Sequence, residues 1–149
     1  MNNNEEKYMQ KALEQAKMAY KLNEIPVGCV IVYKDTVIAQ AHNLKETNQT
    51  ATDHAEIIAI NAASKHLNSW RLSECDLYVT LEPCAMCASA IVQSRIRKVV
   101  IGTLDNKDGA VISSKHIFEN NHNHQLIVKT KVLEQKCKKI IEDFLKNKR

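Results

Sequence analysis

Two short motifs, thirty positions apart, carry the residues best suited to chemistry. The first is His54-Ala55-Glu56 and the second is Pro83-Cys84-Ala85-Met86-Cys87. On a helix, Cys84 and Cys87 lie on one face because their positions are three apart, so both sulfurs can bind one metal ion. A helix N-terminus also stabilises negative charge, which favours the thiolates that metals bind. With the imidazole of His54, the two thiolates form a soft, mixed ligand set that suits zinc.

Three protein ligands indicate a catalytic metal site. A structural zinc site normally has four protein ligands, whereas a catalytic site leaves the fourth position to water. Zinc lowers the pKa of that water from about 15.7 towards about 7, which makes a nucleophile available at neutral pH. A neighbouring carboxylate can take a proton from the water and give it to the leaving group, and Glu56 is the candidate. His54 and Glu56 converge only if His54 lies at the helix cap, because positions two apart in a helix interior do not face each other.

Other interpretations of these residues are open at this point. The Cys-x-x-Cys pair could be a thioredoxin-like redox motif, which would leave His54-Ala55-Glu56 unexplained. The two cysteines could also be inert core residues. The metal could instead be structural, with a fourth ligand from one of three residues that lack a second paired spacing: Cys75, His42 and His66. We expect burial for the three cysteines outside the motif, which are Cys29, Cys75 and Cys137.

The elements that must position these motifs follow from hydrophobic periodicity. Apolar residues at three-and-four spacing predict helices over 5–22, 54–66, 84–94 and 132–146. Runs of β-branched residues predict strands over 27–33, 37–41, 76–81, 98–102 and 126–128, and residues 43–53 show no periodicity. The first two strands should form an antiparallel hairpin, and strand, helix and strand over 76–102 should form a right-handed parallel crossover. The fold class is therefore α/β, with a mixed five-stranded sheet layered with helices.

The same patterns predict which helix faces are buried. The helix over 54–66 should be largely buried because of its apolar residues Ile57, Ile58, Ile60 and Ala62. The last helix should have one apolar side, formed by Leu133, Cys137, Ile140, Ile141, Phe144 and Leu145.

Length and composition indicate one globular domain over residues 1–149. Apolar residues make up 44% and charged residues 26%, which argues against disorder and against a collagen-like chain. With 3 Gly and 2 Pro there is no flexible linker to separate two domains. We recognise neither a signal peptide nor an apolar run long enough to span a membrane, so a cytoplasmic location is expected. Five cysteines in such a chain are expected to be reduced.

Charge is concentrated at the C-terminus. Residues 129–149 carry a net charge of +5, whereas the other 128 residues sum to −1. Such a segment could bind a polyanion such as nucleic acid, or it could be a solvated, lysine-rich helix face.

Beyond the two motifs, the chain resembles the bacterial tRNA-specific adenosine deaminases, of the cytidine and deoxycytidylate deaminase superfamily, over nearly its whole length. The similarity is carried by Glu24-Ile25-Pro26-Val27-Gly28, Ala41-His42-Asn43, His54-Ala55-Glu56, Ser69-Trp70-Arg71-Leu72, residues 77–87, Arg95-Ile96, residues 99–102, Asp105, Lys107, Gly109-Ala110 and Asn123-His124. This resemblance implies a three-layer α/β/α fold of the cytidine deaminase type, with helices on both faces of a mixed five-stranded sheet.

The resemblance also implies a function. It implies zinc-dependent hydrolytic deamination of adenosine to inosine at the wobble position of a tRNA anticodon, that of arginine tRNA, with release of ammonia and with a homodimer as the assembly. His54, Cys84 and Cys87 match the zinc ligands, and Glu56 matches the proton shuttle. Substrate contacts are implied for Asn43, Ala55, Val27, Pro83, Asp105, Lys107, Asn123, His124, Phe144, Lys148 and Arg149.

The residues themselves leave simpler roles open for two of these positions. Asn43 could merely cap the loop after the second strand, and Phe144 could be core. The chain also departs from the family where glycine is usual or where a second phenylalanine is expected: Ser89, Val111-Ile112-Ser113, Lys131 and Phe144-Leu145. Loss of a glycine at a position that needs a positive φ would alter a loop path.

Two other functions remain as alternatives. One is a deaminase of a free nucleobase or nucleoside such as guanine or cytosine, which would share the metal motif. The other is a non-catalytic RNA-binding module that keeps zinc for stability, although such a module would not need Glu56.

Overall fold

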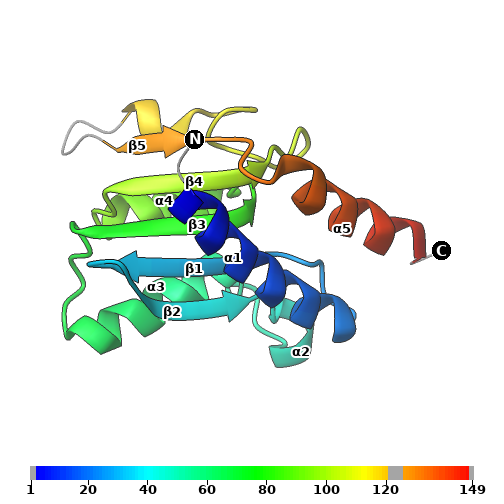
Figure 1. The fold of residues 1–149 in the computed structure, drawn as a ribbon, viewed down its shortest axis with the longest axis horizontal. Coiled ribbons are helices and arrows are strands. Elements are labelled where there is room, and N and C mark those ends of the chain that lie inside the picture. Colours follow the sequence, from blue (N-terminus) through cyan, green and yellow to red (C-terminus); the bar gives the residue numbers. More distant parts are fainter. Residues whose placement is uncertain (1–2, 121–125, 148–149) are drawn as a thin grey trace.

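The computed structural model describes residues 3–120 and 126–147 (Figure 1). In chain order the elements are α1 (Asn3–Lys21), β1 (Gly28–Tyr33), β2 (Thr36–His42), α2 (Lys45–Asn48), α3 (Ala55–Leu67), β3 (Cys75–Leu81), α4 (Ala85–Gln93), β4 (Lys98–Thr103), the 3-10 helix η1 (Ile117–Asn120), β5 (Ile127–Lys129) and α5 (Glu134–Asn147). Over these described ranges, none of the helices combines the length and the apolar character that crossing a membrane requires.

The five strands form one mixed sheet in the order β2-β1-β3-β4-β5. Strand β1 pairs antiparallel with β2 and with β3, whereas β3 pairs parallel with β4, and β4 with β5. The predicted hairpin of β1 and β2 and the predicted parallel pairing on either side of α4 are both confirmed. Because β3 and β4 are parallel, the loops that follow them leave the sheet at the same edge.

Helices cover both faces of the sheet, as the three-layer expectation requires. Figure 1 shows α1 and α5 in front of the sheet and α3 and α4 behind it. The side chains of β1 alternate between the two cores: Cys29 and Ile31 pack on the side of α3 and α4, and Val30 and Val32 pack on the side of α1. A sheet with both faces covered explains why these strands read as continuous apolar runs.

Small residues let α1 lie directly on the start of β1. Ala12, Ala16 and Ala19 are all fully buried. A Cβ atom at Gly28 would overlap the backbone carbonyl of Ala12, so only glycine permits this approach. The amide of Gly28 donates to Thr80 Oγ1 at 3.1 Å, which ties β1 to β3.

Several element boundaries differ from the prediction for identifiable reasons. The polar segment 43–53 contains the short helix α2, whose first turn is capped from a distance by Glu24 through the amides of Glu46 (3.2 Å) and Thr47 (2.5 Å). Strand β5 begins at Ile127, one residue after the predicted start. Helix α5 begins at Glu134, because Leu133 has a φ of 53° and cannot belong to a right-handed helix.

Two burial expectations are wrong. Helix α3 is only partly buried, and its Ala62 is exposed because the inward face is formed by Ala55, Glu56, Ala59, Ile60 and Ala63. In α5, Cys137 and Phe144 are buried, but Leu145 is 57% exposed because it points away from the face that packs on the sheet. The expectation that Cys29, Cys75 and Cys137 are buried and not in disulfides is confirmed.

The positions where this chain lacks a glycine that is usual in the family have different structural consequences. Lys131 has a φ of 67°, so the chain places a lysine in the left-handed region that favours glycine. Such a conformation costs roughly 1–2 kcal/mol in a residue with a Cβ atom. Val111, Ile112 and Ser113 are not among the residues with positive φ, so the loop they form does not require glycine.

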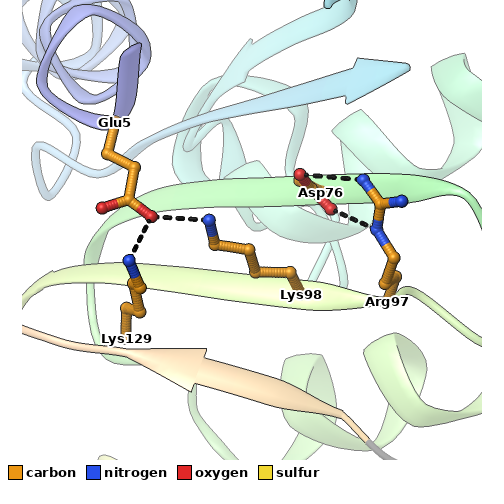
Figure 2. Close-up of polar contacts among 5 residues, drawn as sticks. All are labelled: Glu5, Asp76, Arg97, Lys98 and Lys129. Carbon is orange, nitrogen blue, oxygen red and sulfur yellow. Dashed lines mark hydrogen bonds and ion pairs between the residues drawn. The ribbon is translucent and has the colours of Figure 1, made fainter. Parts of the chain in front are cut away.

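A cluster of ion pairs fastens α1 to the parallel end of the sheet. The carboxylate of Glu5 is buried and pairs with Lys98 of β4 at 2.5 Å and with Lys129 of β5 at 2.9 Å (Figure 2). Nearby, Arg97 donates two hydrogen bonds to Asp76 at 3.0 and 3.2 Å. Burial by itself would raise the pKa of Glu5, but the two lysines reverse this effect and the pKa is lowered.

We predict that Glu5→Gln destabilises the protein by about 1–2 kcal/mol at neutral pH, since it leaves two lysines without their shared partner. Because the pKa of Glu5 is lower in the folded state, its contribution is complete above the ordinary glutamate pKa. That contribution is lost as pH falls through the folded-state pKa. Urea unfolding at neutral and acidic pH should therefore show the two proteins converging in acid. Glu14→Gln, an exposed change in the same helix, is the control and should change stability by less than about 0.5 kcal/mol. A difference between wild type and Glu5→Gln that stays constant with pH would contradict this account.

Candidate metal centre and active site

The starts of α3 and α4 present His54 and Cys84 to each other. Both residues are N-caps with extended backbone, His54 at φ −78° and ψ 155° and Cys84 at φ −74° and ψ 177°. Neither side chain makes the capping hydrogen bond that an N-cap residue usually makes, so both side chains are available as ligands. His54 therefore lies outside the helical region, which is the condition stated above for its convergence with Glu56, and Glu56 lies in the first turn of α3.

The donor atoms of His54, Cys84 and Cys87 are spaced as a metal site requires. Nδ1 of His54 lies 3.7 Å from Sγ of Cys84 and 3.6 Å from Sγ of Cys87, and all three donor atoms are within 4.8 Å of one another. Tetrahedral zinc with bonds of about 2.3 Å to sulfur and about 2.05 Å to nitrogen would separate these atoms by about 3.6 Å. The residues therefore fit zinc in both ligand type and spacing.

The local electrostatics favour a thiolate in this group. A hydrogen bond from Cys87 is the largest cause that lowers the pKa of Cys84 to about 3, and a hydrogen bond to His54 acts in the same direction. The same shared proton, together with burial, raises the pKa of Cys87. The hydrogen bond to Cys84 also raises the pKa of His54. Of the two thiols, Cys84 is thus the one that ionises more readily.

Glu56 is a buried carboxyl group beside the ligands. It is 4% exposed and lies in the first turn of α3, where its pKa is raised to about 7, first because burial disfavours the charged form. A hydrogen bond to its own backbone amide opposes this effect without cancelling it. A carboxyl group with a pKa near neutrality can both accept and release a proton at physiological pH, which suits general acid and base catalysis.

One cavity of about 460 Å³ joins these groups to the surface. Its lining comprises Ile25, Val27, Asn43, Lys45, His54, Ala55, Glu56, Leu81, Glu82, Cys84, Ala85, Met86, Asp105, Asp108 and Lys115. Seven residues named from the sequence therefore line one space: Val27, Asn43, His54, Ala55, Glu56, Cys84 and Asp105. The cavity has the mixed apolar and polar character of a small-molecule site.

Asn43 caps its loop and also lies at the cavity. Its side-chain oxygen accepts the amide of Lys45 at 3.1 Å, and its amide group donates to the carbonyl of Ile25 at 3.3 Å, so it does cap its loop. It also lines the cavity. The amide group has a second N–H, so the turn does not use all of its hydrogen-bonding capacity.

Other expected contact residues lie away from the cavity lining. Pro83 is buried, and its carbonyl accepts the amide of Ala110 at 2.9 Å. Lys107 is exposed and is not part of the lining. Phe144 lines a neighbouring cavity of about 440 Å³, which shares Ile25, Asn43 and Lys45 with the first. The remaining four expected residues, Asn123, His124, Lys148 and Arg149, lie outside the described residues.

Eight lining residues were not identified from the sequence as functional: Ile25, Lys45, Leu81, Glu82, Ala85, Met86, Asp108 and Lys115. Two of them could have been identified from the sequence: Ala85 and Met86 lie between the two candidate ligands Cys84 and Cys87, so they must lie near the metal centre. Lys45, the first residue of α2, and Lys115, in a loop, line the cavity without any local motif that would identify them.

The alternative with a structural metal finds no support in the described part of the chain. There, the candidate ligand group contains only His54, Cys84 and Cys87. His42 is engaged by Gln15, with 2.8 Å between its Nδ1 and the side-chain oxygen, and Cys75 is buried in the core. Neither residue, nor His66, joins the group as a fourth ligand.

Comparisons with known proteins find relatives over nearly the whole chain. A family model described as MafB19-like deaminase matches residues 3–149. The tRNA-specific adenosine deaminase of Bacillus subtilis (strain 168) is 44% identical over 146 residues, which cover 97% of this chain and 91% of that protein. The corresponding protein of Rickettsia typhi is 42% identical over 144 residues, covering 95% and 97%. A structure from studies of A-to-I editing by tRNA:A34 deaminases superimposes with a TM-score of 0.86 at 39% identity, covering 90% of this chain and 98% of that one.

We predict that the purified protein binds about one zinc ion per chain under reducing conditions. Cys87→Ala should weaken zinc binding by more than about 100-fold, because even the loss of an outer partner of a ligand costs about 10–100-fold. Metal analysis and competition with a chelator measure both quantities. Cys137→Ala removes a buried thiol on the other face of the sheet and is the matched control, which should keep the zinc. Wild type without zinc, or equal losses in the two variants, would refute the ligand assignment.

Proposed function

Because the chain belongs to the tRNA-specific adenosine deaminase family, we propose that it converts adenosine to inosine at the wobble position of a tRNA anticodon, that of arginine tRNA. One observation carries the proposal: the donor atoms of His54, Cys84 and Cys87 form one group, and His54, Cys84 and Glu56 line one cavity, in a chain with this relationship. We assign His54, Cys84 and Cys87 as zinc ligands and residues 1–149 as one zinc-dependent deaminase domain.

The reaction is a hydrolysis in which water replaces the amino group of adenine. When bound, zinc supplies an activated water at neutral pH. Glu56 accepts a proton from the attacking water as the new C–O bond forms and delivers it to the amino group. The C–N bond then breaks and ammonia leaves. A pKa of about 7 suits Glu56 to both transfers, since it is a competent base and a competent acid at that pH.

The cavity suits one base taken out of its stack. Its volume of about 460 Å³ admits a base with part of its sugar, and Val27 and Ala55 supply apolar and backbone surface beside the polar Asn43. Extrusion of a base costs a few kcal/mol, and less from a single-stranded loop than from a duplex. An anticodon loop therefore presents its adenosine at a low cost, which supports the assignment of a tRNA substrate.

We propose that the RNA backbone follows the groove between α1 and α5. This groove has a volume of about 490 Å³, and its lining carries Lys17, Lys21, Lys136 and Lys139 against a single acidic residue, Asp143. Phe144 packs against Tyr20, with ring centroids 5.6 Å apart, and lines the cavity that adjoins the active site. A positively charged surface that extends towards the active site suits the flanking phosphates of an anticodon loop.

The proposed substrate also indicates where the enzyme acts. The enzyme should act in the cytoplasm, where tRNA is available. The homodimer expected from the resemblance, and the RNA contacts of Asn123, His124, Lys148 and Arg149, stay predictions.

The experiment that tests the function offers the zinc-loaded protein four substrates: an arginine anticodon stem-loop, free adenosine, free cytosine and free guanine. Inosine and ammonia should form from the stem-loop only. Glu56→Ala should keep its zinc while turnover falls by about 10²–10⁴-fold, the usual contribution of general acid and base catalysis. Turnover of a free base alone would instead assign the protein to the free-nucleobase deaminases. Full activity in Glu56→Ala would place the proton transfer elsewhere.

The phosphate-binding groove makes a separate prediction. Replacing Lys136 and Lys139 by Ala should weaken binding of the stem-loop and reduce the slope of log K against log salt by about 1 to 2, since each lost phosphate contact accounts for about 0.7–0.9. The double variant Lys7→Ala/Lys65→Ala removes the same charge from exposed positions outside the groove and should leave the slope within about 0.5 of wild type. Equal slopes in the two double variants would exclude this groove from the RNA contact.

A further inference from the structure

Glu82 is a buried carboxylate that the metal chemistry does not use. It follows β3, precedes Pro83 and is 2% exposed. A buried glutamate carries a high desolvation cost unless hydrogen bonds satisfy its oxygens. The partners of Glu82 therefore indicate what it does.

In the described part of the chain, the hydrogen-bond donors to the Glu82 carboxylate all come from one loop, residues 105–113. Oε1 accepts the amide of Asp105 at 2.9 Å and the hydroxyl of Ser113 at 2.6 Å. Oε2 accepts three consecutive amides, those of Val111 (3.1 Å), Ile112 (2.7 Å) and Ser113 (2.9 Å). The carboxylate thus joins the two ends of the loop, and hydrogen bonds to an ionised acceptor are the strong kind.

Two further contacts keep the loop against Glu82. The amide of Ala110 donates to the carbonyl of Pro83 at 2.9 Å. At Gly109 a Cβ atom would overlap both the Glu82 carboxylate and the carbonyl of Asp105. Glycine at this position therefore permits close contact between the loop and the carboxylate.

The loop forms part of the wall of the active-site cavity. Asp105 and Asp108 line the cavity together with His54 and Glu56, and Lys115, which follows the loop, lines it as well. At another part of the cavity wall, a second buried glutamate also accepts hydrogen bonds from backbone amides. Glu24, 1% exposed, accepts the amides of Glu46 and Thr47 and so holds the segment that carries Asn43 and Lys45.

We propose that Glu82 is a positioning residue that holds the 105–113 loop as a preformed wall of the substrate cavity. Through this loop it sets the affinity for RNA, while the chemical step depends on Glu56 and the metal ligands. The proposal rests on the proposed function for its substrate, and it concerns a residue that does not touch the reacting atoms.

The test compares zinc-loaded Glu82→Gln with wild type. The variant keeps one acceptor oxygen and places an amide donor against backbone amide donors, so the loop should lose its closed position. We expect KM for the anticodon stem-loop to rise about tenfold and kcat to stay within about threefold, since the binding surface changes and the reacting groups do not. In hydrogen exchange, the amides of Asp105, Val111, Ile112 and Ser113 should exchange at least about tenfold faster, with the rest of the sheet unchanged.

Three companion variants make the result specific. In Gly109→Ala the new methyl group would overlap the Glu82 carboxylate and displace the loop. Ser113→Ala removes one hydrogen-bond donor to Glu82. Both variants should therefore raise KM, like Glu82→Gln. The double variant Glu82→Gln/Gly109→Ala should be no worse than the more severe single variant, because both disrupt one contact. Glu5→Gln is the matched control. It changes another buried glutamate, far from this cavity lining, and should leave KM and loop exchange as in wild type.

Several outcomes would overturn the proposal. Loss of zinc, or a fall in kcat at unchanged KM, would show that Glu82 serves the neighbouring ligand Cys84. Unchanged exchange of the loop amides would show that the loop does not need the carboxylate. If Glu82→Gln does not fold, Gly109→Ala and Ser113→Ala decide the question by the same measurements. If wild type does not deaminate the stem-loop, the proposed function fails. Hydrogen exchange of the loop amides then still tests whether Glu82 holds the 105–113 loop.

Discussion

Everything in the active site depends on the meeting of two helix N-termini. The sheet brings α3 and α4 together, and each helix begins immediately after a residue with extended backbone, His54 or Cys84. An N-cap side chain that does not cap its own helix is free to bind something else, and the dipole of α4 favours the thiolate form of Cys84. The ligand triad is therefore a consequence of where the helices start, and Glu56 reaches it because it lies in the first turn.

Four buried glutamates show how environment assigns different roles to one side chain. In each of the four, burial by itself acts to raise the pKa of the carboxyl group. In Glu24, hydrogen bonds from the start of α2 reverse the effect and keep the carboxylate charged; hydrogen bonds from the 105–113 loop do so in Glu82, and two lysines do so in Glu5. Glu56 has no comparable set of donors, so its pKa stays raised, to about 7. The first three are suited to holding the structure together, whereas Glu56 is suited to proton transfer.

The binding surface is divided between rigid and loop-borne parts. The candidate ligands and Glu56 come from helix starts, which the core holds firmly, whereas Asn43 and Asp105 come from loops and Lys45 begins the short helix α2. Chemistry requires positions fixed to fractions of an ångström, and helices packed on a sheet provide this. Under the proposed function, recognition of RNA requires a wider surface, and the α1–α5 groove with its lysines is the positively charged surface proposed for it. The segments held by Glu24 and Glu82 line the cavity beside the candidate ligands. Hydrogen bonds to the two carboxylates fix these segments in place.

The pairing of Cys84 with Cys87, the hairpin and the parallel strands could be predicted from local patterns, because spacing along a helix or strand determines which side chains share a face. The candidate metal centre with His54 and Glu56 is predicted from the residue types of two motifs thirty positions apart. Other features depend on contacts between distant segments and could not be predicted. Helix α2 exists because Glu24, some twenty residues earlier, caps it, and the 105–113 loop is closed by Glu82. Likewise, the exposure of Ala62 and Leu145 depends on which helix face meets the sheet. Hydrophobic periodicity identifies an apolar residue, but only packing decides whether another element covers it.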